Sequence, residues 1–314
     1  MRIGVFCRRE DDTARQLARE LNRLEPGCCA TFHHDAIVAG AIVLTANAIR
    51  WNEIELTSLE SAWISGFPYM DPVVPPVAGR PDWARWQYEH LLEQQTYSAL
   101  ESVMAELERR GVRFVNSRTQ ALAEFSKAEQ LLRLGRNACP IPKLLCSNDA
   151  QQVEAFCSRF GNVVWRPPTG RAAWQRFTEK QKLHLIGSNK PPVVLAEQLG
   201  EQFTMAWCID SDTMLCLDLE APASRPVETL GNPADYGELL RFETLEMLTV
   251  RDPQDHAREL GIAWRNCPGL RWAAVTLMCD KDGRAVIYDI DPDPDISWLP
   301  APLRDWLTQC IARR

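Results

Sequence analysis

The sequence has no apolar run that approaches the roughly 20 residues needed to cross a bilayer. Its first residues, MRIGVFCRRE, return to charged side chains after a short apolar stretch, so we expect no secretory signal peptide. Positive charge is not in excess, because 35 Lys and Arg face 42 Asp and Glu and the net charge is -7. A general nucleic-acid binder would carry a basic face. We therefore expect a cytoplasmic protein that binds neither membranes nor nucleic acids.

Short catalytic and metal-binding motifs are absent as well. The sequence contains no GxSxG, Walker A or GxGxxG element. Its 11 cysteines are scattered and form no CxxC or CxH cluster, so we expect reduced, buried thiols rather than zinc ligands. His33, His34 and Asp35 could form a metal or acid-base cluster, but no partner ligand stands at a recognisable spacing. A turn that leads to a strand is the better interpretation.

The composition is that of a folded protein, with 46% apolar and 25% charged residues over 314 residues. Strand-like and helix-like segments alternate from the N-terminus, which indicates an α/β fold class. We predict three units, at 1–116, 117–190 and 191–314. In the first unit we expect a strand at 1–6 and a helix from Asp11 or Asp12 to just before Gly27. Its other expected elements are strands at 36–44, 53–64 and 113–116, a Pro- and Gly-rich loop at 66–83 and a helix at 84–110.

The later units follow the same kind of pattern. We predict a helix at 118–136, a turn at PIPK, and a helix at 149–160 with the N-cap cluster Ser147-Asn148-Asp149. The other predicted elements are strands at 162–168, 192–199, 202–210, 213–221, 272–279 and 285–291, a loop with a return strand at 169–179, a hairpin turn at Asp282-Gly283, and helices at 254–266 and 301–313.

Two acids end an apolar strand in AVIYDID. Asp289 and Asp291 stand at i and i+2 and therefore point to the same face. Like charges side by side are costly unless water or a cation neutralises them. Their oxygens would suit Mg²⁺, which prefers carboxylates together with phosphate oxygens. The alternative is a solvated strand end that enters a Pro-Asp turn.

Two further segments could contact a nucleotide. Arg166 ends an apolar strand just before a loop with Thr169 and Gly170, which favours a phosphate contact, although an interface salt bridge is the alternative. The backbone at Glu197-Gln198 could hydrogen-bond an adenine, or could be an ordinary strand edge. Lys127 lies on a helix, where a lysine is normally solvated, so its position alone indicates no function.

Six segments then occur in a characteristic order. They are residues 82–116, the lysine-bearing SKAEQL at 126–131, PIPKLLCSND at 140–149, VVWRPPTG at 163–170, VVLAEQLGEQFTMAWCID at 193–210 and AAVTLMCDKDGRAVIYDIDPDPD at 273–295. This order resembles the ATP-grasp superfamily, in particular the branch of glutathione synthetase and ribosomal-protein glutamate ligase. The resemblance implies an α+β body in two parts with a nucleotide cleft between them, preceded by an N-terminal α/β unit.

The resemblance also implies ATP and Mg²⁺ as cofactors and gives residues their roles. Lys127, as an exposed phosphate contact, and Arg166 would be the catalytic cations that neutralise the phosphates. The other implied contacts are Thr169 and Gly170 in the lid, Glu197, Gln198 and Leu199 at the adenine hinge, and Asp289 and Asp291 for the metal.

Several positions depart from the family pattern, among them Gln202, which stands where this branch has an aspartate. Arg166 replaces a lysine and Asp291 replaces an asparagine. Thr276 stands where the family has a metal-binding acid, and Thr204 where this branch has an arginine.

Two functions remain open. The first is an ATP-dependent ligase that joins a carboxylate to an amine or another nucleophile through an acyl phosphate, with a small-molecule or peptide substrate. The second is a catalytically degenerate member that acts as a nucleotide- or partner-binding scaffold for a protein partner. Homo-oligomers are expected by analogy with the family.

Overall fold

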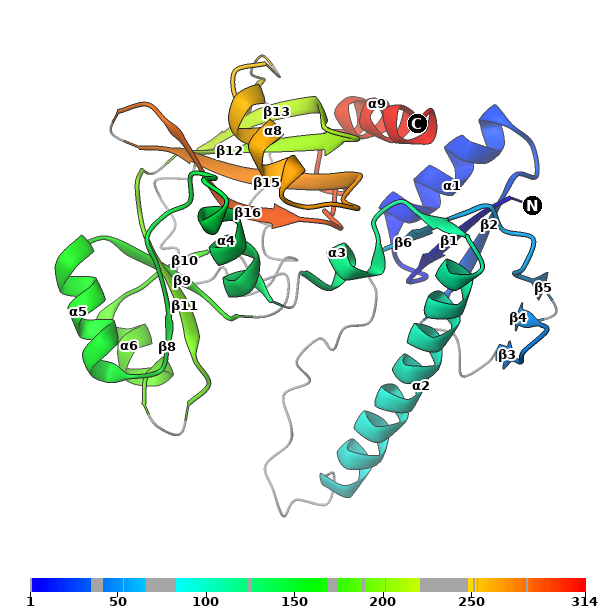
Figure 1. The fold of residues 1–314 in the computed structure, drawn as a ribbon, viewed down its shortest axis with the longest axis horizontal. Coiled ribbons are helices and arrows are strands. Elements are labelled where there is room, and N and C mark those ends of the chain that lie inside the picture. The colour runs from blue at the N-terminus through cyan, green and yellow to red at the C-terminus, as the bar shows by residue number, and fades with distance from the viewer. Residues whose placement is uncertain are drawn as a thin grey trace. The chain divides into compact units, whose positions relative to one another are not determined.

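The structure is a computed structural model of the chain. It describes residues 2–34, 42–52, 54–65, 83–123, 126–168, 174–187, 190–200, 202–220, 248–250, 252, 254–280 and 282–314 (Figure 1). Contacts divide it into two units: Met1–Arg118 with Ile311–Arg313, and Thr119–Cys310 with Arg314. The predicted boundaries at 116 and 190 stay predictions. In the parts of the chain that the structure describes, no helix is long and apolar enough to cross a membrane.

A parallel sheet in the order β2-β1-β6-β7 forms the base of the first unit. Its strands are β1 (Ile3–Cys7), β2 (Cys29–His33), β6 (Ser61–Ile64) and β7 (Arg113–Phe114). Parallel neighbours need a crossover, which α1 (Asp12–Leu24) provides between β1 and β2. The predicted N-cap of this helix is confirmed, because the Asp11 side chain accepts a hydrogen bond from the Ala14 amide at 2.8 Å.

The long helix α2 (Trp83–Arg109) covers this unit's core with its C-terminal half. Leu100, Val103, Met104 and Leu107 are fully buried there, in one cluster with Phe6 and Phe32. Beside it lies a small antiparallel sheet of β3 (Ile42–Leu44), β4 (Ile49–Trp51) and β5 (Ile54–Glu55).

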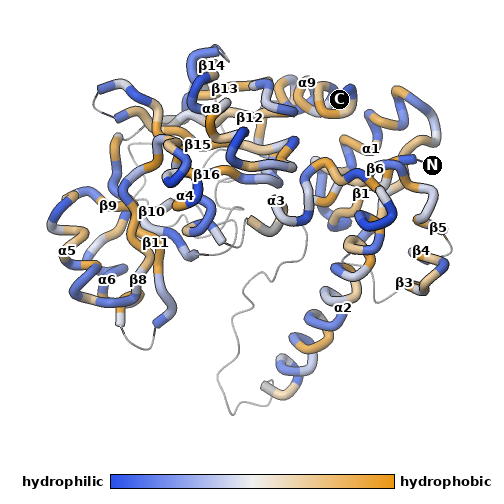
Figure 2. Tube along the Cα trace, in the orientation of Figure 1, coloured by the Kyte–Doolittle hydropathy of each residue, from blue (hydrophilic) through white to orange (hydrophobic). Residues whose placement is uncertain are grey.

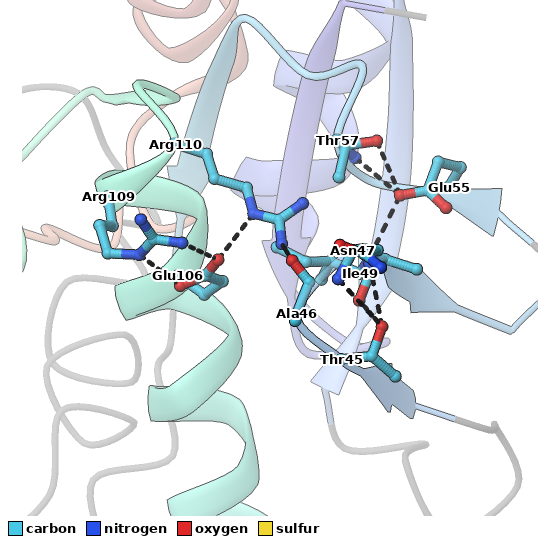
Figure 3. Close-up of polar contacts among 10 residues, drawn as sticks. Thr45, Ala46, Asn47, Ile49, Glu55, Thr57, Glu106, Arg109 and Arg110 are labelled. Carbon is cyan, nitrogen blue, oxygen red and sulfur yellow. Dashed lines mark hydrogen bonds and ion pairs between the residues drawn. The ribbon is translucent and has the colours of Figure 1, made fainter.

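Arg110 connects the end of α2 to that small sheet (Figure 3). Its Nη2 donates to the Ala46 carbonyl at 2.9 Å and its Nε donates to Glu106 Oε1 at 2.7 Å. Arg109 donates to the same carboxylate from the other side. These hydrogen bonds lower the pKa of Glu106 to about 2, so the carboxylate stays charged at any ordinary pH.

Some expectations for this unit are wrong. The single strand expected at 53–64 is two strands, β5 and β6, because the chain turns where the Leu59 amide donates to the Leu56 carbonyl. Strands β2 and β4 were not predicted, and His33 ends β2. The expected strand at 36–44 falls mostly outside the described residues, and its last part is β3.

The second unit contains two antiparallel sheets. The smaller has the order β10-β9-β11-β8 and consists of β8 (Leu144–Ser147), β9 (Val163–Arg166), β10 (Gln175–Arg176) and β11 (Val193–Glu197). Helices α5 (Ala150–Phe160) and α6 (Glu179–Leu185) belong with it. Val153 of α5 packs with Val163, Val193 and Leu195 in its core. Figure 2 shows apolar residues along β9 and β11.

The larger sheet has the order β14-β13-β12-β15-β16. Its strands are β12 (Gln202–Ile209), β13 (Asp212–Glu220), β14 (Leu248–Val250), β15 (Trp272–Cys279) and β16 (Ala285–Asp291). Helices α4 (Lys127–Arg136) and α8 (Ala257–Arg265) contribute Leu131, Leu134, Leu260 and Ala263 to its core. The other helices among the described residues are α3 (Arg118–Leu122) and α9 (Ala301–Ala312).

These elements confirm the α/β fold class and most of the predicted strands and helices. The helix expected at 118–136 is wrong as one element, because α3 and α4 are separate helices. The predicted end at 136 is confirmed, because α4 ends at Arg136. Strands β8 and β14 and helix α6 were not predicted.

Candidate functional site

Lys127 is the first residue of α4 and its side chain is fully buried. Nζ lies 2.6 Å from the Ile290 carbonyl oxygen, to which it donates, and 2.7 Å from Asp289 Oδ1. The expectation of an exposed lysine is therefore wrong. The physical reason is the helical repeat, since Lys127, Leu131 and Leu134 at i, i+4 and i+7 share the buried face of α4.

Arg166 reaches the same carboxylate from another element. It is the last residue of β9, is buried, and its Nη1 lies 2.7 Å from Asp289 Oδ2. Its guanidinium carbon lies 5.8 Å from the ring centre of Trp174, within the range of a cation–π contact. The backbone joins the two cations as well, because the Lys127 amide donates to the Pro168 carbonyl just beyond β9 (3.3 Å).

Asp289 is thus held by one cation on each oxygen. Burial by itself would raise the pKa of this carboxyl, but Lys127 and Arg166 outweigh it and hold the pKa below its usual value. The side chain is 18% exposed, so one edge of the cluster is open to solvent. A carboxylate held between a buried lysine and a buried arginine is strongly polarised, and such perturbed groups cluster at functional sites.

Asp291 is partly buried and accepts a hydrogen bond from the Asp293 amide at 2.9 Å. In the antiparallel pair of β15 and β16, Thr276 stands opposite Asp289 and Ala274 stands opposite Asp291. No acid therefore faces either aspartate across the strand pair. Among the residues that the structure describes, no group of three or more His, Cys, Asp or Glu is placed to hold a metal ion.

The segment from Glu197 to Leu199 begins at the last residue of β11. Glu197 pairs with Lys143, whose amide donates to Glu197 Oε1 at 2.9 Å. The Gln198 amide donates to the Asn162 carbonyl at 2.9 Å. Two other backbone groups of this segment contact a tyrosine: Tyr288 donates its hydroxyl to the Glu197 carbonyl at 2.6 Å and accepts from the Leu199 amide at 3.1 Å.

Sequence reasoning assigned no contact to Tyr288 or to Trp174. Trp174 donates its indole N–H to the Tyr288 carbonyl at 3.1 Å, and the two rings meet edge-on with centres 6.1 Å apart. The only signal for Trp174 was its place after a glycine-bearing loop.

The structure brings Lys127, Arg166 and Asp289 into one cluster and Glu197 and Leu199 into a second, and Trp174 and Tyr288 connect the two. Thr169 and Gly170 lie outside the described residues. The hydroxyl of Thr204 donates to Asp218 Oδ1 at 2.7 Å, and Asp218 belongs to neither of these two clusters.

No protein-family model and no curated protein matches the chain. Solved structures do match it over nearly its whole length. The ATP-grasp ligase PsnB, complexed with minimal precursor, Mg and ADP, has a TM-score of 0.70 at 16% identity and covers 99% of this chain and 98% of its own. The macrocyclase MdnC from Microcystis aeruginosa MRC, bound with precursor peptide MdnA, has a TM-score of 0.74 at 14% identity and covers 100% and 98%. D-cycloserine synthetase DcsG has a TM-score of 0.59 at 14% identity and covers 99% of both chains.

These likenesses establish that the chain has the ATP-grasp fold, as its sequence predicted. Its resemblance to the glutathione synthetase and ribosomal-protein glutamate ligase branch stays a prediction.

Proposed function

We propose that this chain is an ATP-dependent ligase that acts on a peptide. The observation that carries the proposal is the cluster in which Lys127 of α4 and Arg166 of β9 meet Asp289 of β16. These three elements are far apart in the sequence, and each brings a residue of the type that phosphoryl transfer uses. The peptide is supported by neighbours of the same fold that are complexed with precursor peptides and ADP or AMPPNP.

ATP fits the residues present. Lys127 and Arg166 would bind its phosphates, since buried cations form strong, charge-assisted hydrogen bonds to phosphate oxygens. The base would lie at the segment Glu197–Leu199, which offers one backbone acceptor and one backbone donor. The surroundings there are apolar, with Val164 and Ala196 buried in the same cluster.

Mg²⁺ fits less fully. Asp289 and Asp291 would hold it, and phosphate oxygens and water would complete the oxygen ligands that this ion prefers. Thr276, opposite Asp289, adds no carboxylate. The bound ion would supply charge neutralisation on the phosphates.

In the proposed reaction, a substrate carboxylate attacks the γ-phosphate of ATP, the bond between the γ-phosphorus and the bridging oxygen breaks, and the products are an acyl phosphate and ADP. An amine or another nucleophile then displaces phosphate and forms the new bond. Lys127 and Arg166 neutralise charge on the transferred phosphoryl group, and their burial keeps water away from it. This chain's contribution is therefore positioning and electrostatics rather than covalent catalysis.

A second candidate function is a nucleotide- or partner-binding scaffold that performs no ligation. Two observations favour it. Thr276 is neutral where a third acid would face Asp289, and the hydroxyl of Tyr288 already occupies the backbone groups that a base would use.

Calorimetric titration with AMPPNP, with and without Mg²⁺, tests nucleotide binding. Lys127→Met should weaken binding by about tenfold or more, the effect of one charged hydrogen bond, and Lys180→Met, at an exposed position of α6, should leave it unchanged. Asp289→Asn should reduce the dependence on Mg²⁺. Absence of binding by the folded wild-type chain would overturn the proposal.

Ligation itself is tested by incubating the chain with Mg-ATP and synthetic peptides that carry carboxylate and amine side chains. Mass spectrometry should find the loss of one water for each bond formed, together with ADP. Nucleotide binding without ADP or product for any peptide would favour the scaffold instead.

A further inference from the structure

Tyr288 is fully buried at the centre of an apolar cluster beside the hinge segment. The cluster's other members are Val164, Ala196 and Val286, with Leu144, Trp174, Leu199 and Met278 packed against them. A buried phenol must place its hydroxyl on a polar partner, because an unpaired one would carry the full cost of lost hydration. In this protein both partners are backbone groups of one short segment.

The two partners have opposite polarity. The Tyr288 hydroxyl donates to the Glu197 carbonyl (2.6 Å) and accepts from the Leu199 amide (3.1 Å). A base with an exocyclic amine beside a ring nitrogen, as in adenine, offers the same pair: one donor and one adjacent acceptor. A single hydroxyl oxygen thus makes both hydrogen bonds that such a base would make.

The ring of Tyr288 also fills space that a base would need. Stacking of a planar base requires apolar atoms on its faces, and the atoms that line this cluster are already packed against the phenol ring. Trp174 holds this arrangement, because its indole N–H bonds the Tyr288 carbonyl and its ring meets the phenol edge-on. Trp174 in turn lies under Arg166, so the aromatic pair runs from the hinge to the phosphate-binding cations.

We infer that Tyr288 occupies the base position of the nucleotide site and competes there with a purine nucleotide. The inference rests on the proposed function, since it concerns the same site. A nucleotide binds with its base at the hinge only after the phenol leaves, and its apparent affinity falls by the fraction of molecules in which Tyr288 is displaced. Tyr288 therefore sets both the affinity and the base dependence of nucleotide binding.

The test compares two ligands on the full chain: AMPPNP, which has a base, and inorganic tripolyphosphate, which has none. Tyr288→Leu keeps the pocket apolar and removes both the ring and its hydroxyl. AMPPNP should bind about tenfold tighter or more. In the wild type, Tyr288 is displaced from the base position in about 10% of molecules or fewer, whereas in the variant the position is open in every molecule. Tripolyphosphate should bind as it does to the wild type. Val153→Ala truncates a buried residue of a separate core cluster, away from the hinge, and should leave both affinities unchanged.

Tyr288→Phe provides a second variant of nearly equal volume. It removes only the hydroxyl, which frees the Glu197 carbonyl and the Leu199 amide while the ring still blocks the base. AMPPNP should bind more tightly than to the wild type but less tightly than to Tyr288→Leu. The five tyrosines of the chain also allow fluorotyrosine NMR, in which the Tyr288 signal, identified by its loss in the Phe variant, should move when AMPPNP binds.

The outcomes separate this inference from the proposed function. If wild type and both variants bind AMPPNP equally, or the variants bind it more weakly, Tyr288 is no competitor, although the nucleotide site stands. If the Leu variant gains affinity for tripolyphosphate as much as for AMPPNP, the base is not involved and the inference is wrong. If none of the folded proteins binds AMPPNP, the proposed function is wrong and the inference is overturned with it.

Discussion

Arg166 and Asp289 form a buried ion pair across the two sheets of the second unit, with Nη1 and Oδ2 2.7 Å apart. The arginine ends β9 in the smaller sheet and the aspartate lies in β16 of the larger one. Lys127 binds the other oxygen of the same carboxylate. One acid therefore ties together a helix and two sheets, and it holds both cations in the places where they could meet a phosphate.

Asp289→Asn should destabilise the protein by about 3 kcal/mol, because it leaves two buried cations without the charge that compensates them. Urea unfolding at neutral pH measures this loss. Combining it with Lys127→Met should cost less than the sum of the single variants, since one of the stranded charges is then gone. Additive losses would show that Lys127 and Asp289 are not energetically coupled, despite the 2.7 Å contact.

A second ion pair gives a pH-dependent prediction. Arg271 donates Nε and Nη2 to the two oxygens of Asp210 at 2.6 and 2.8 Å, and these hydrogen bonds lower the pKa of Asp210 from its ordinary 3.8. A lowered carboxyl pKa stabilises the folded state above pH 3.8, and this contribution disappears as the pH falls through the folded pKa. Because Arg271 is 42% exposed, we expect about 1 kcal/mol or less.

Asp210→Asn isolates that charge. Asp210 has φ of 50°, in the left-handed region that asparagine also tolerates, so the turn should be kept. Wild type should be more stable than the variant in urea unfolding at pH 6, and the difference should shrink steadily as the pH falls below 3.8. A difference that persists unchanged at pH 3 would mean that the ion pair is not its source.

Helix α5 tests a prediction that came from sequence alone. The Asp149 side chain accepts a hydrogen bond from the Gln152 amide at 2.9 Å and so caps the helix as predicted. Asp149→Ala should lower the free energy of unfolding by about 1 kcal/mol, whereas Asp149→Asn should nearly preserve it, because asparagine is an equally good N-cap. Equal losses in both variants would assign the effect to charge rather than to capping.

Capping and strand signals are local, and for this reason the sequence could predict them. The N-caps Asp11 and Asp149 each bond an amide three residues on. The burial of Lys127 was also encoded, in its helical spacing from Leu131 and Leu134. The expectation failed there because lysine is almost never fully buried unless it is paired, and its partner lies 162 residues away in the chain.

Tyr288 could not have been singled out in the same way. In AVIYDID it is one apolar residue of a buried strand, and its role depends on a hydroxyl that meets residues 91 and 89 positions away. Such a contact follows from how β11 and β16 pack together, which no spacing within either segment reveals. Short β8 and β14 were missed for a related reason, since a strand of three or four residues carries too little alternation to be recognised.

Thr276→Asp tests where the metal ion would bind. Thr276 stands directly opposite Asp289 on the neighbouring strand, so the new carboxylate would face an existing one. Facing like charges destabilise a strand pair, and a cation between them relieves the repulsion. Lys127 and Arg166 offset part of this repulsion, so the variant's Tm should fall modestly without Mg²⁺ and should rise as millimolar Mg²⁺ is added. Thr276→Asn, of the same shape without the charge, should show neither effect. If the Tm of Thr276→Asp does not respond to Mg²⁺, the metal site lies away from β15 and β16. The proposed role of Asp289 as a metal ligand is then wrong.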